Sequence, residues 1–347
     1  MGIAVGVVGR GYGRSVLVPA FRADTRCEIV GIAATDGEHA RLAAAEAGIE
    51  RAFADWRAMV KDRSIDAVVV ATPPFAQPEI VLSALQQGKA VFAEKPMALN
   101  LADAEAMTNC ALSSNRPNMI DFNFTEIGVW KQARKILAEG GIGAVRHVAV
   151  QWNTESYANR MRLANWKSSS SQGGGALFNF VSHSLHYVEW FAGPVTGLCS
   201  SLFRMPGDNR SGDTTVVMAL SFRSGAAGSL SMSAAAYLGS GHRLEFYGDE
   251  GTLVLENTTS DYMKGFRLLY GKRPQAQLEP ITADDPDEGR YADGRILAAS
   301  RLASRFLDWM EKGTAARPDF RDGLRVQRLL GAARDSDEKR CWVTVSD

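Results

Sequence analysis

The first 122 residues alternate short apolar runs with segments of helical periodicity. This pattern limits the possible fold more than any other feature of the chain. A continuous apolar strand must be covered on both faces, which is the environment of a parallel sheet flanked by helices. The sequence therefore predicts such a sheet. Its strands are expected at residues 3–8, 28–33, 65–71, 90–93 and 118–122, with helices at 37–47, 78–87 and 101–113, the first two ending at Gly48 and Gly88.

Beyond residue 125 the rhythm changes to an alternation of apolar and polar residues, which is typical of antiparallel strands. We place a domain boundary near residue 122, so that the predicted domains are residues 1–122 and 123–347. The second domain is expected to contain helices at residues 129–139, 295–311 and 322–333, an exposed loop at 272–294, and strands at 144–152, 195–204, 214–222, 226–235, 243–248, 252–256 and 341–345.

The composition supports two globular domains, because 347 residues exceed the roughly 100 to 200 of a typical single domain. Lys plus Arg and Asp plus Glu each total 39, so no net charge attracts nucleic acid or an anionic membrane. No apolar stretch approaches the ~18 residues that a membrane-spanning helix needs, and the amino terminus carries no targeting pattern. We expect a cytoplasmic protein whose four scattered cysteines form neither disulfides nor a zinc site.

A glycine-rich turn follows the first predicted strand directly. Gly9 allows a tight turn, Gly11 lets the backbone approach a pyrophosphate, and the start of the next helix offers free N–H groups to phosphates. The usual dinucleotide-binding pattern has its third glycine three residues after the second. Arg14 stands at that position and Gly13 precedes it, which leaves the packing of this helix open, while Pro19 is expected to kink or end the helix.

Lys95 lies directly after the apolar run at residues 89–93, within the triplet Glu94-Lys95-Pro96. The carboxyl ends of parallel strands face the crevice where open α/β sheets bind ligands. A lysine in that position can stabilise negative charge on a reacting oxygen. The Lys95–Pro96 peptide bond is expected to be cis, since an X-Pro bond tolerates that form.

A second candidate for chemistry is the predicted helix at residues 176–191, which follows three consecutive glycines, Gly173 to Gly175. Apolar residues lie on one face of this helix and polar residues on the other. The polar face, which suggests the wall of a cleft, carries Asn179, Ser182, His183, His186 and Glu189. Either histidine could instead be structural, since neutral histidine readily bridges buried groups. The two histidines are three residues apart, with no nearby carboxylate motif of a known metal type, so no metal is expected.

In their order along the chain, these segments resemble the Gfo/Idh/MocA family, named for glucose-fructose oxidoreductase and inositol 2-dehydrogenase. Further matching segments lie at residues 71–74, 87–89, 140–143 and 247–252. The resemblance implies an α/β domain, a doubly wound parallel Rossmann sheet, followed by an α+β domain with an open antiparallel β-sheet flanked by helices. It also implies a homodimer or homotetramer that associates through the second sheet.

The resemblance implies an NAD(P)-dependent oxidoreductase that transfers a hydride between the nicotinamide and a CH–OH group of a sugar, polyol or related small molecule. Lys95 would stabilise the developing alkoxide and His183, at the family's acid/base position, would handle the proton. The family usually has an aspartate where this chain has Asn179, which can hydrogen-bond a substrate hydroxyl but cannot carry charge. The implied catalytic residues are Lys95, His183 and Asn179.

The cofactor, NAD or NADP, is expected to lie against the glycine turn and the ends of the following strands. These residues are Gly9, Gly11, Tyr12, Gly13, Ala34, Thr35, Asp36, Thr72, Pro73, Pro74, Glu94 and Lys95. Ala34 occupies the position of the acidic residue that would hold the ribose 2′-hydroxyl. Asp36 would favour NAD, whereas Thr35 with Arg41 would favour NADP, and the sequence does not decide between them.

Substrate selection is expected to involve polar and aromatic residues on strand ends and loops, although each could equally be a solvated loop residue. They are Asn123, Asn153, Tyr157, Asn159, Arg160, Trp166 and His186. The competing interpretation is a non-catalytic sensor or regulatory protein that binds a dinucleotide on the same fold, and Asn179 gives it some weight. Retention of Lys95 together with His183 argues for the enzyme.

Overall fold

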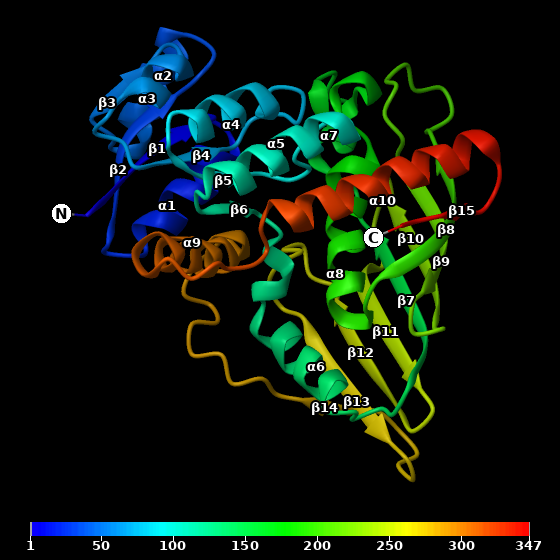
Figure 1. Ribbon diagram of the computed structural model, residues 1–347. Coiled ribbons are helices and arrows are strands. Elements are labelled where there is room, and N and C mark those ends of the chain that lie inside the picture. The colour runs from blue at the N-terminus through cyan, green and yellow to red at the C-terminus, as the bar shows by residue number, and fades with distance from the viewer. Residues whose placement is uncertain (1, 347) are drawn as a thin grey trace. The chain divides into compact units, whose positions relative to one another are not determined.

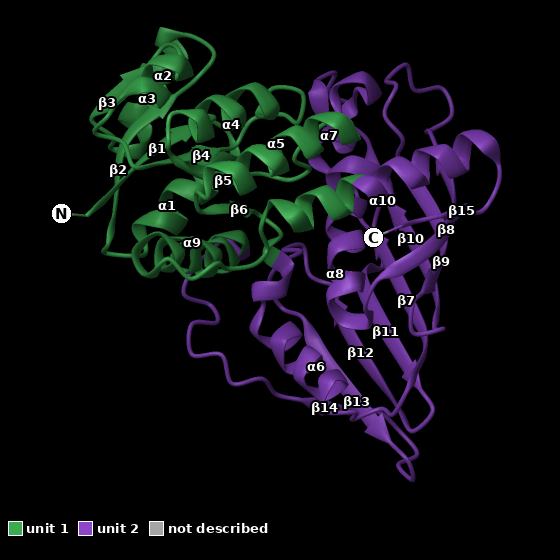
Figure 2. Ribbon diagram, in the orientation of Figure 1, with its two compact units in different colours: residues 1–123, 295–327 green, residues 124–294, 328–347 purple. Residues whose placement is uncertain are grey.

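The computed structural model describes residues 2–346 and divides the chain into two compact units (Figure 1, Figure 2). Unit 1 comprises Met1–Asn123 and Arg295–Gln327, and unit 2 comprises Phe124–Gly294 and Arg328–Asp347. This division differs in one respect from the two continuous domains that the sequence suggests. Residues 295–327 return to unit 1, because the apolar stripe of a late helix completes the core of that unit.

Unit 1 contains a six-stranded parallel sheet in the order β3-β2-β1-β4-β5-β6, with helices on both of its sides (Figure 1). The order reverses between β1 and β4, which is where open α/β sheets bind ligands. The strands are β1 (Ile3–Val8), β2 (Cys27–Ala33), β3 (Arg51–Phe53), β4 (Ala67–Val70), β5 (Ala90–Ala93) and β6 (Asn118–Ile120). The helices are η1 (Gly13–Leu17), α1 (Val18–Arg22), α2 (Gly37–Ala47), α3 (Trp56–Lys61), α4 (Gln77–Gln86), α5 (Leu101–Ser114), α9 (Gly294–Lys312) and the first part of α10 (Phe320–Lys339).

The core of unit 1 explains why α9 belongs to it. Phe306 of α9 packs edge-on against Phe21 of α1 and Phe92 of β5, with ring centroids 6.2 and 5.8 Å apart. Phe21 and Phe92 are themselves 5.3 Å apart, and none of the three rings reaches solvent. Each such ring removes a large apolar area from water, so the sheet of unit 1 needs α9 as its cover on this side.

The parallel sheet and its helices confirm the fold predicted for the first part of the chain. Gly48 and Gly88 follow α2 and α4 with positive φ angles of 59° and 74°, and the Lys95–Pro96 bond is cis, as expected. The predictions missed β3 and α3, which are too short to show a clear period. They also extended β6 to residue 122, whereas the strand ends at Ile120.

Unit 2 contains a nine-stranded sheet in the order β14-β13-β12-β11-β7-β10-β9-β8-β15. It is mixed: β7 and β10 are parallel, and the other neighbouring pairs within residues 2–346 are antiparallel. Its strands are β7 (Val145–Asn153), β8 (Val195–Phe203), β9 (Thr215–Phe222), β10 (Ala227–Ser233), β11 (Gly241–Gly248), β12 (Gly251–Asn257), β13 (Arg267–Lys272), β14 (Glu279–Ile281) and β15 (Val343–Thr344). Part of the predicted loop at 272–294 is therefore the edge strand β14.

Helices α6 (Gly128–Ala138) and α8 (Ser182–Ala192), with the end of α10, accompany this sheet (Figure 1). Burial along strand β9 shows which face of the sheet these helices cover. Val216, Met218 and Leu220 are buried, whereas Val217 is 45% exposed, so one face packs on the core and the other faces outward. Ser200 of β8 is tied to α10, since its hydroxyl donates to the carbonyl of Ala333 at 2.6 Å.

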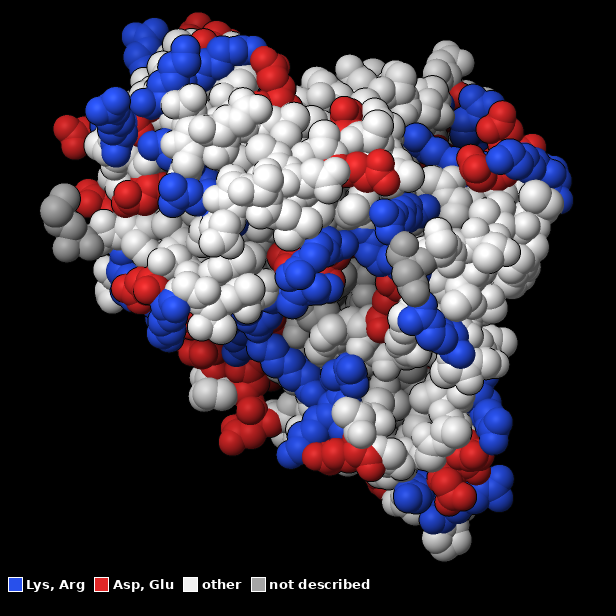
Figure 3. All heavy atoms as spheres, in the orientation of Figure 1, with Lys and Arg blue, Asp and Glu red and all other residues white. Residues whose placement is uncertain are grey.

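The surface carries both signs of charge. Figure 3 shows Lys and Arg side chains interspersed with Asp and Glu on the face drawn, in agreement with equal totals of 39 and 39. Among the described residues, the helices are each too short or too polar to cross a membrane.

The core of unit 2 is rich in aromatic side chains and contains a buried histidine. The ring of His242 stacks on Trp152 with a centroid distance of 4.2 Å and an interplanar angle of 5°. Its Nε2 lies 2.9 Å from the hydroxyl of Tyr187, which itself donates to Ser184 at 2.7 Å. Because the Tyr187 proton is directed to Ser184, His242 is the donor to Tyr187. Burial lowers the pKa of His242 to about 3, so the ring stays neutral.

Because His242 is neutral in the folded protein, we expect acid to lower the free energy of unfolding through this residue. The folded pKa of His242 lies below the ordinary histidine value of about 6.5, so its contribution to stability is present above that pH and is lost as the pH falls toward 3. The free energy of unfolding should fall by about 1.4 kcal/mol per pH unit from this group alone. Urea unfolding at several pH values should show a shallower decline in His242→Asn than in the wild type. Tyr187→Phe, which removes only the partner hydroxyl, should keep the wild-type slope and lower stability by about 1 kcal/mol throughout.

Candidate active site

The turn after β1 has the backbone geometry of a phosphate-binding loop. Gly9 has a φ of +125°, and a Cβ there would lie 2.3 Å from the carbonyl oxygen of Ala71, so only glycine fits. At Gly11, by contrast, a Cβ would meet nothing within 4 Å. Gly9 therefore makes the turn, and Gly11 leaves open space beside the backbone where a pyrophosphate can approach.

Gly13 performs the packing role that the usual third glycine has. A Cβ at Gly13 would lie 3.0 Å from side-chain atoms of both Val7 and Ala71, so the helix start is pressed against β1 and the end of β4. The first turn, η1, is a π-helix, and α1 begins after it with Pro19 in its first turn. Gly13 therefore lies at the close contact between helix and strand, one residue before the usual third glycine, and it opens a π turn rather than an α turn.

The end of β2 carries the residues considered for ribose recognition. The carboxylate of Asp36 caps α2: Oδ1 accepts the N–H of His39 at 2.9 Å, and Oδ2 lies 2.7 Å from Nδ1 of the same residue. The backbone N–H of His39 lowers the pKa of Asp36. Arg41 is turned back onto its own helix, where Nε donates to the carbonyl of Gly37 at 3.2 Å. A fixed negative charge here favours a ribose with a free 2′-hydroxyl over one with a 2′-phosphate.

The loop that carries Lys95 is held by a residue that the sequence analysis did not identify. Gln77, fully buried in the first turn of α4, donates from Nε2 to the carbonyl of Pro96 at 2.9 Å. This bond fixes the loop next to the lysine. A polar residue after Pro73 and Pro74 was the available signal, but a glutamine in the first turn of a helix is usually solvent-exposed.

A cluster of polar side chains lies beside Lys95. Its members come from the start of η1 and from the segments that follow β5 and β6. Tyr12 donates its hydroxyl proton to Oδ2 of Asp121 at 3.2 Å, and Nδ2 of Asn123 contacts both the Tyr12 oxygen at 3.1 Å and Asp121 at 3.4 Å. Glu94 and Asp121 follow the paired residues Ala93 and Ile120 at the ends of β5 and β6. Burial raises the pKa of both carboxyls, and the charge of Lys95 opposes the rise. Tyr12, Glu94, Lys95 and Asn123 were predicted site residues; Asp121 was assigned to the interior of a strand and was missed.

This end of unit 1 offers acceptors to a nicotinamide nucleotide. Oγ1 of Thr72 and Oδ1 of Asn123 are buried without a hydrogen-bond partner among the described residues. Buried acceptors of this kind are normally satisfied, so the two that follow β4 and β6 indicate a ligand rich in donors. The carboxamide and ribose hydroxyls of a nicotinamide nucleotide are such donors. The residues present therefore fit NAD.

In unit 2, the histidine-bearing helix is anchored by Asp213. The carbonyl oxygen of Asp213 accepts the N–H of Ala176 and its Oδ2 accepts the N–H of Leu177, both at 2.7 Å. A Cβ at Gly175 would lie 2.2 Å from Oδ1 of Asp213, which explains the last of the three consecutive glycines. The first turn after this anchor, η5 (Leu177–Val181), is again a π-helix, a feature often found at functional sites.

The polar residues of this helix differ in their surroundings. His183 is 8% exposed, and its ring packs edge-on against Phe124 at 4.9 Å. Asn179 uses Nδ2 to bond two backbone carbonyls, that of Gly175 at 2.9 Å and that of Lys167 at 3.1 Å. His186 lies one turn further on and is half-buried. Asn179 therefore joins the start of the helix to the preceding loop, a contact that an aspartate could not make.

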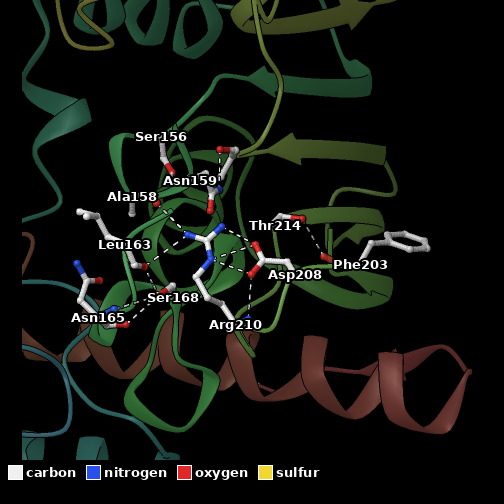
Figure 4. Close-up of polar contacts among 11 residues, drawn as sticks. Ser156, Ala158, Asn159, Leu163, Asn165, Ser168, Phe203, Asp208, Arg210 and Thr214 are labelled. Atoms are coloured by element: carbon white, nitrogen blue, oxygen red, sulfur yellow. Dashed lines mark hydrogen bonds and ion pairs between the residues drawn. The ribbon is translucent and has the colours of Figure 1, made fainter. Parts of the chain in front are cut away.

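The loop at residues 154–172, which carries most of the predicted substrate residues, is clamped from a neighbouring loop (Figure 4). Arg210 pairs with Asp208 and donates from Nη1 to the carbonyl of Ala158 at 2.8 Å. The pair is largely buried, and Arg210 lowers the pKa of Asp208 to about 2. Asn159 donates to the carbonyl of Ala234 at 2.8 Å, so it supports the loop.

The remaining predicted substrate residues lie at the surface of unit 2. Tyr157 is 63% exposed, and the guanidinium of Arg160 lies 5.7 Å from the centre of its ring, both within α7 (Tyr157–Arg160). Trp166 is half-buried in η3 (Trp166–Ser168), and Nδ2 of Asn153 donates to the hydroxyl of Ser240 at 3.0 Å. Across residues 2–346, no group of three or more His, Cys, Asp or Glu side chains is arranged to hold a metal ion.

A doubly wound sheet with a glycine turn at its switch point, and a lysine with buried acceptors at the strand ends, defines a dinucleotide-binding oxidoreductase. Comparison with known proteins identifies the family. Residues 3–122 match the oxidoreductase family with an NAD-binding Rossmann fold, and residues 130–254 match the GFO/IDH/MocA C-terminal domain. The chain belongs to the Gfo/Idh/MocA family and is an NAD-binding oxidoreductase.

Two curated relatives extend over most of the chain. An uncharacterized oxidoreductase from Synechocystis is 27% identical over 360 residues, covering 99% of this chain and 96% of the relative. Levoglucosan dehydrogenase from Pseudarthrobacter phenanthrenivorans is 26% identical over 352 residues, covering 90% and 88%.

Solved structures agree in fold. A levoglucosan dehydrogenase in complex with NADH and levoglucosan superposes with a TM-score of 0.90 at 23% identity, covering 100% of both chains. The aldose-aldose oxidoreductase from Caulobacter crescentus, complexed with glycerol, gives 0.86 at 19% identity, covering 99% of this chain and 100% of that one.

The two glycines of the turn predict opposite defects. Gly11→Ala should fold with wild-type stability, because its Cβ meets nothing, but should weaken NADH binding by occupying the space beside the backbone. Gly13→Ala should lower the free energy of unfolding by on the order of 1 kcal/mol through crowding against Val7 and Ala71. Urea unfolding and NADH fluorescence titration of both variants measure the two effects. Wild-type NADH affinity in Gly11→Ala would show that the pyrophosphate lies elsewhere.

Proposed function

We propose that this protein oxidises a secondary hydroxyl, or reduces the corresponding carbonyl, of a sugar, polyol or related small molecule with NAD. The observation that carries this proposal is Lys95 at the carboxyl end of β5, beside buried acceptors that suit a nicotinamide. The names of levoglucosan dehydrogenase and aldose-aldose oxidoreductase support the substrate class.

NAD, when bound, supplies the hydride acceptor or donor. The protein has to hold the reacting carbon in place and manage one proton and one developing charge. Gly9, Gly11 and Thr72 hold the nucleotide in this proposal, with Glu94 at its nicotinamide end. Lys95 stabilises the negative charge that develops on the substrate oxygen.

His183 takes up or releases the hydroxyl proton, as the usual acid/base residue of this chemistry does. Asn179 holds the loop at Lys167 against the start of the helix, so its role is to position rather than to transfer a proton. In the proposal, substrate hydroxyls are recognised by Asn123 together with Tyr157, Arg160, Trp166 and His186.

Turnover tests the proposal directly. The full chain, supplied with NAD or NADH, should show a substrate-dependent change in NADH absorbance with at least one member of a panel of sugars, polyols and their keto forms. NADH binding is measured in parallel by fluorescence. Tight binding without turnover across the panel would contradict the proposal and indicate a sensor of dinucleotide.

Two substitutions should separate catalysis from cofactor binding. Lys95→Ala should lower kcat on the order of 10² to 10⁴-fold, because a positioned charge stabiliser is lost, while NADH affinity stays near wild type. His183→Ala should also lower kcat strongly and flatten the pH dependence near neutrality. Wild-type turnover in either variant would remove that residue from the mechanism.

Asn179→Ala provides the contrast to these two variants. Loss of the amide frees the carbonyls of Lys167 and Gly175, so the loop that carries Trp166 loosens, and KM should rise more than kcat falls. Steady-state kinetics on one substrate measure all three variants. A loss of kcat equal to that of His183→Ala would mean that Asn179 acts on the reacting atoms.

We also propose that the outward face of the second sheet joins copies of this chain into a homodimer or homotetramer. Val217 is 45% exposed and Tyr247 is 39% exposed on this sheet, and a second copy of the sheet packed on its outward face would cover both side chains. Light scattering at micromolar concentration should report an oligomer for the wild type and a smaller species for Val217→Glu. Leu112→Glu, a similar change at an exposed residue of α5 in unit 1, is the matched control. A monomeric wild type would contradict this.

A further inference from the structure

Glu94 and Asp121 form a buried pair of carboxyl groups that the reaction described above does not explain. The N–H of Asp121 donates to the carbonyl of Ala93 at 2.9 Å, which extends the pairing of β5 and β6 by one residue. Ala93 pairs with Ile120, so Glu94 and Asp121 are the next register neighbours and their side chains leave the same face of the sheet. Asp121 is 1% exposed. Oε1 of Glu94 and Oδ1 of Asp121 are both buried, although part of Glu94 reaches solvent.

The hydrogen-bond donors around the pair are unevenly distributed. Asp121 accepts on Oδ2 from the Tyr12 hydroxyl at 3.2 Å and from Asn123 at 3.4 Å. Because Asn123 also donates to the Tyr12 oxygen, the Tyr12 proton is directed toward Asp121. Within residues 2–346, the Glu94 carboxyl accepts one N–H hydrogen bond, that of Lys95, at 3.3 Å. Donors therefore favour a charged Asp121 more than a charged Glu94.

The burial and charges around the pair also favour a protonated Glu94 beside an ionised Asp121. Burial raises the pKa of Glu94, and the neighbouring Asp121 raises it further. Burial also raises the pKa of Asp121, but the hydrogen bonds from Glu94 and Tyr12 and the charge of Lys95 oppose this rise. Arg295 of α9 adds a cation 5.6 Å from the centre of the Tyr12 ring. Two adjacent buried carboxylates would repel each other, so one proton on the pair is the favourable state.

We propose that Glu94 carries this proton at neutral pH and donates it in a hydrogen bond to the Asp121 carboxylate, so that the pair bears one negative charge that positions Lys95 and keeps it protonated. Glu94 and Asp121 are then positioning residues that act through Lys95. The first half of the proposal concerns the protein alone. The second half, the effect on catalysis, rests on the function proposed above.

A single charge suits the chemistry better than two. Lys95 and an Asp121 carboxylate compensate each other, which leaves the end of β5 and β6 close to neutral. A second carboxylate would make this end anionic and would oppose the negative charge that develops on a substrate oxygen. With no carboxylate in the pair, the ammonium of Lys95 would lose a nearby negative charge that favours its protonated form.

Infrared spectroscopy of the cofactor-free protein tests the proton's location without any turnover. The wild type at neutral pH should show the C=O stretch of a protonated carboxyl that is absent from Glu94→Gln and retained, with a shifted frequency, in Asp121→Asn. A wild-type spectrum that does not differ from that of Glu94→Gln in this region would overturn the proposal. So would a band that survives in Glu94→Gln and disappears in Asp121→Asn, because the proton would then belong to Asp121.

The wild-type band can also be followed with pH, which does not depend on whether a variant folds. It should persist well above the ordinary carboxyl range of about 4 to 5. Loss of the band within that range would show that both carboxyls are ionised at neutral pH.

The pH profile of kcat/KM tests the second half. Asp121→Asn should move the alkaline limb to lower pH by about one unit, since Lys95 loses its counter-charge. Glu94→Gln replaces one neutral group by another and should leave the position of that limb unchanged, whatever it does to the rate. The reverse pattern, or no shift in either variant, would contradict the link to Lys95. If no substrate is turned over, the infrared result still decides the location of the proton, so the two failures are distinguishable.

Discussion

The parallel ladder of unit 1 continues one residue beyond its strands, and the candidate site depends on this. The N–H groups of Gly9, Ala71, Glu94 and Asp121 donate to the carbonyls of the adjacent strands at 2.8 to 2.9 Å. The strands therefore stay in register to their carboxyl ends, and the residues that follow them lie together at that end of the sheet. Glycine at the first of these positions gives a phosphate turn, and acidic residues at the last two give the buried pair.

Much of this edge could be predicted from sequence because its signals are local. A glycine turn after an apolar strand, or a lysine directly after one, has a meaning that depends only on neighbouring residues. Asp121 and Gln77 were missed because their roles depend on distant partners: Asp121 meets Tyr12 across 109 residues, and Gln77 meets Pro96 across 19. The prediction that β6 ends at residue 122 also placed Asp121 inside the strand. The strand ends at Ile120, so Asp121 is the first residue after it and belongs to the polar cluster at the end of the sheet.

Unit 2 was harder to predict for the same reason. Alternation identified most of its strands but could not show that β7 and β10 run parallel, because the buried face of a strand has the same pattern in either orientation. The assignment of α9 to unit 1 rests on Phe306 meeting Phe21 and Phe92, a contact between residues hundreds of positions apart. The three glycines before the histidine helix were visible in the sequence, but their partner Asp213 was not.

Asn179 stands where the family usually has an aspartate, and its amide makes hydrogen bonds that a carboxylate could not make. An amide donates two protons, and here both go to the carbonyls of Lys167 and Gly175. An aspartate in the same place would set a carboxylate against two carbonyl oxygens, and the loop would have to move. The asparagine therefore secures the geometry of the loop but gives up any part in proton transfer. In the function proposed above, His183 handles the proton and Lys95 stabilises the charge, so the mechanism does not require a carboxylate at position 179.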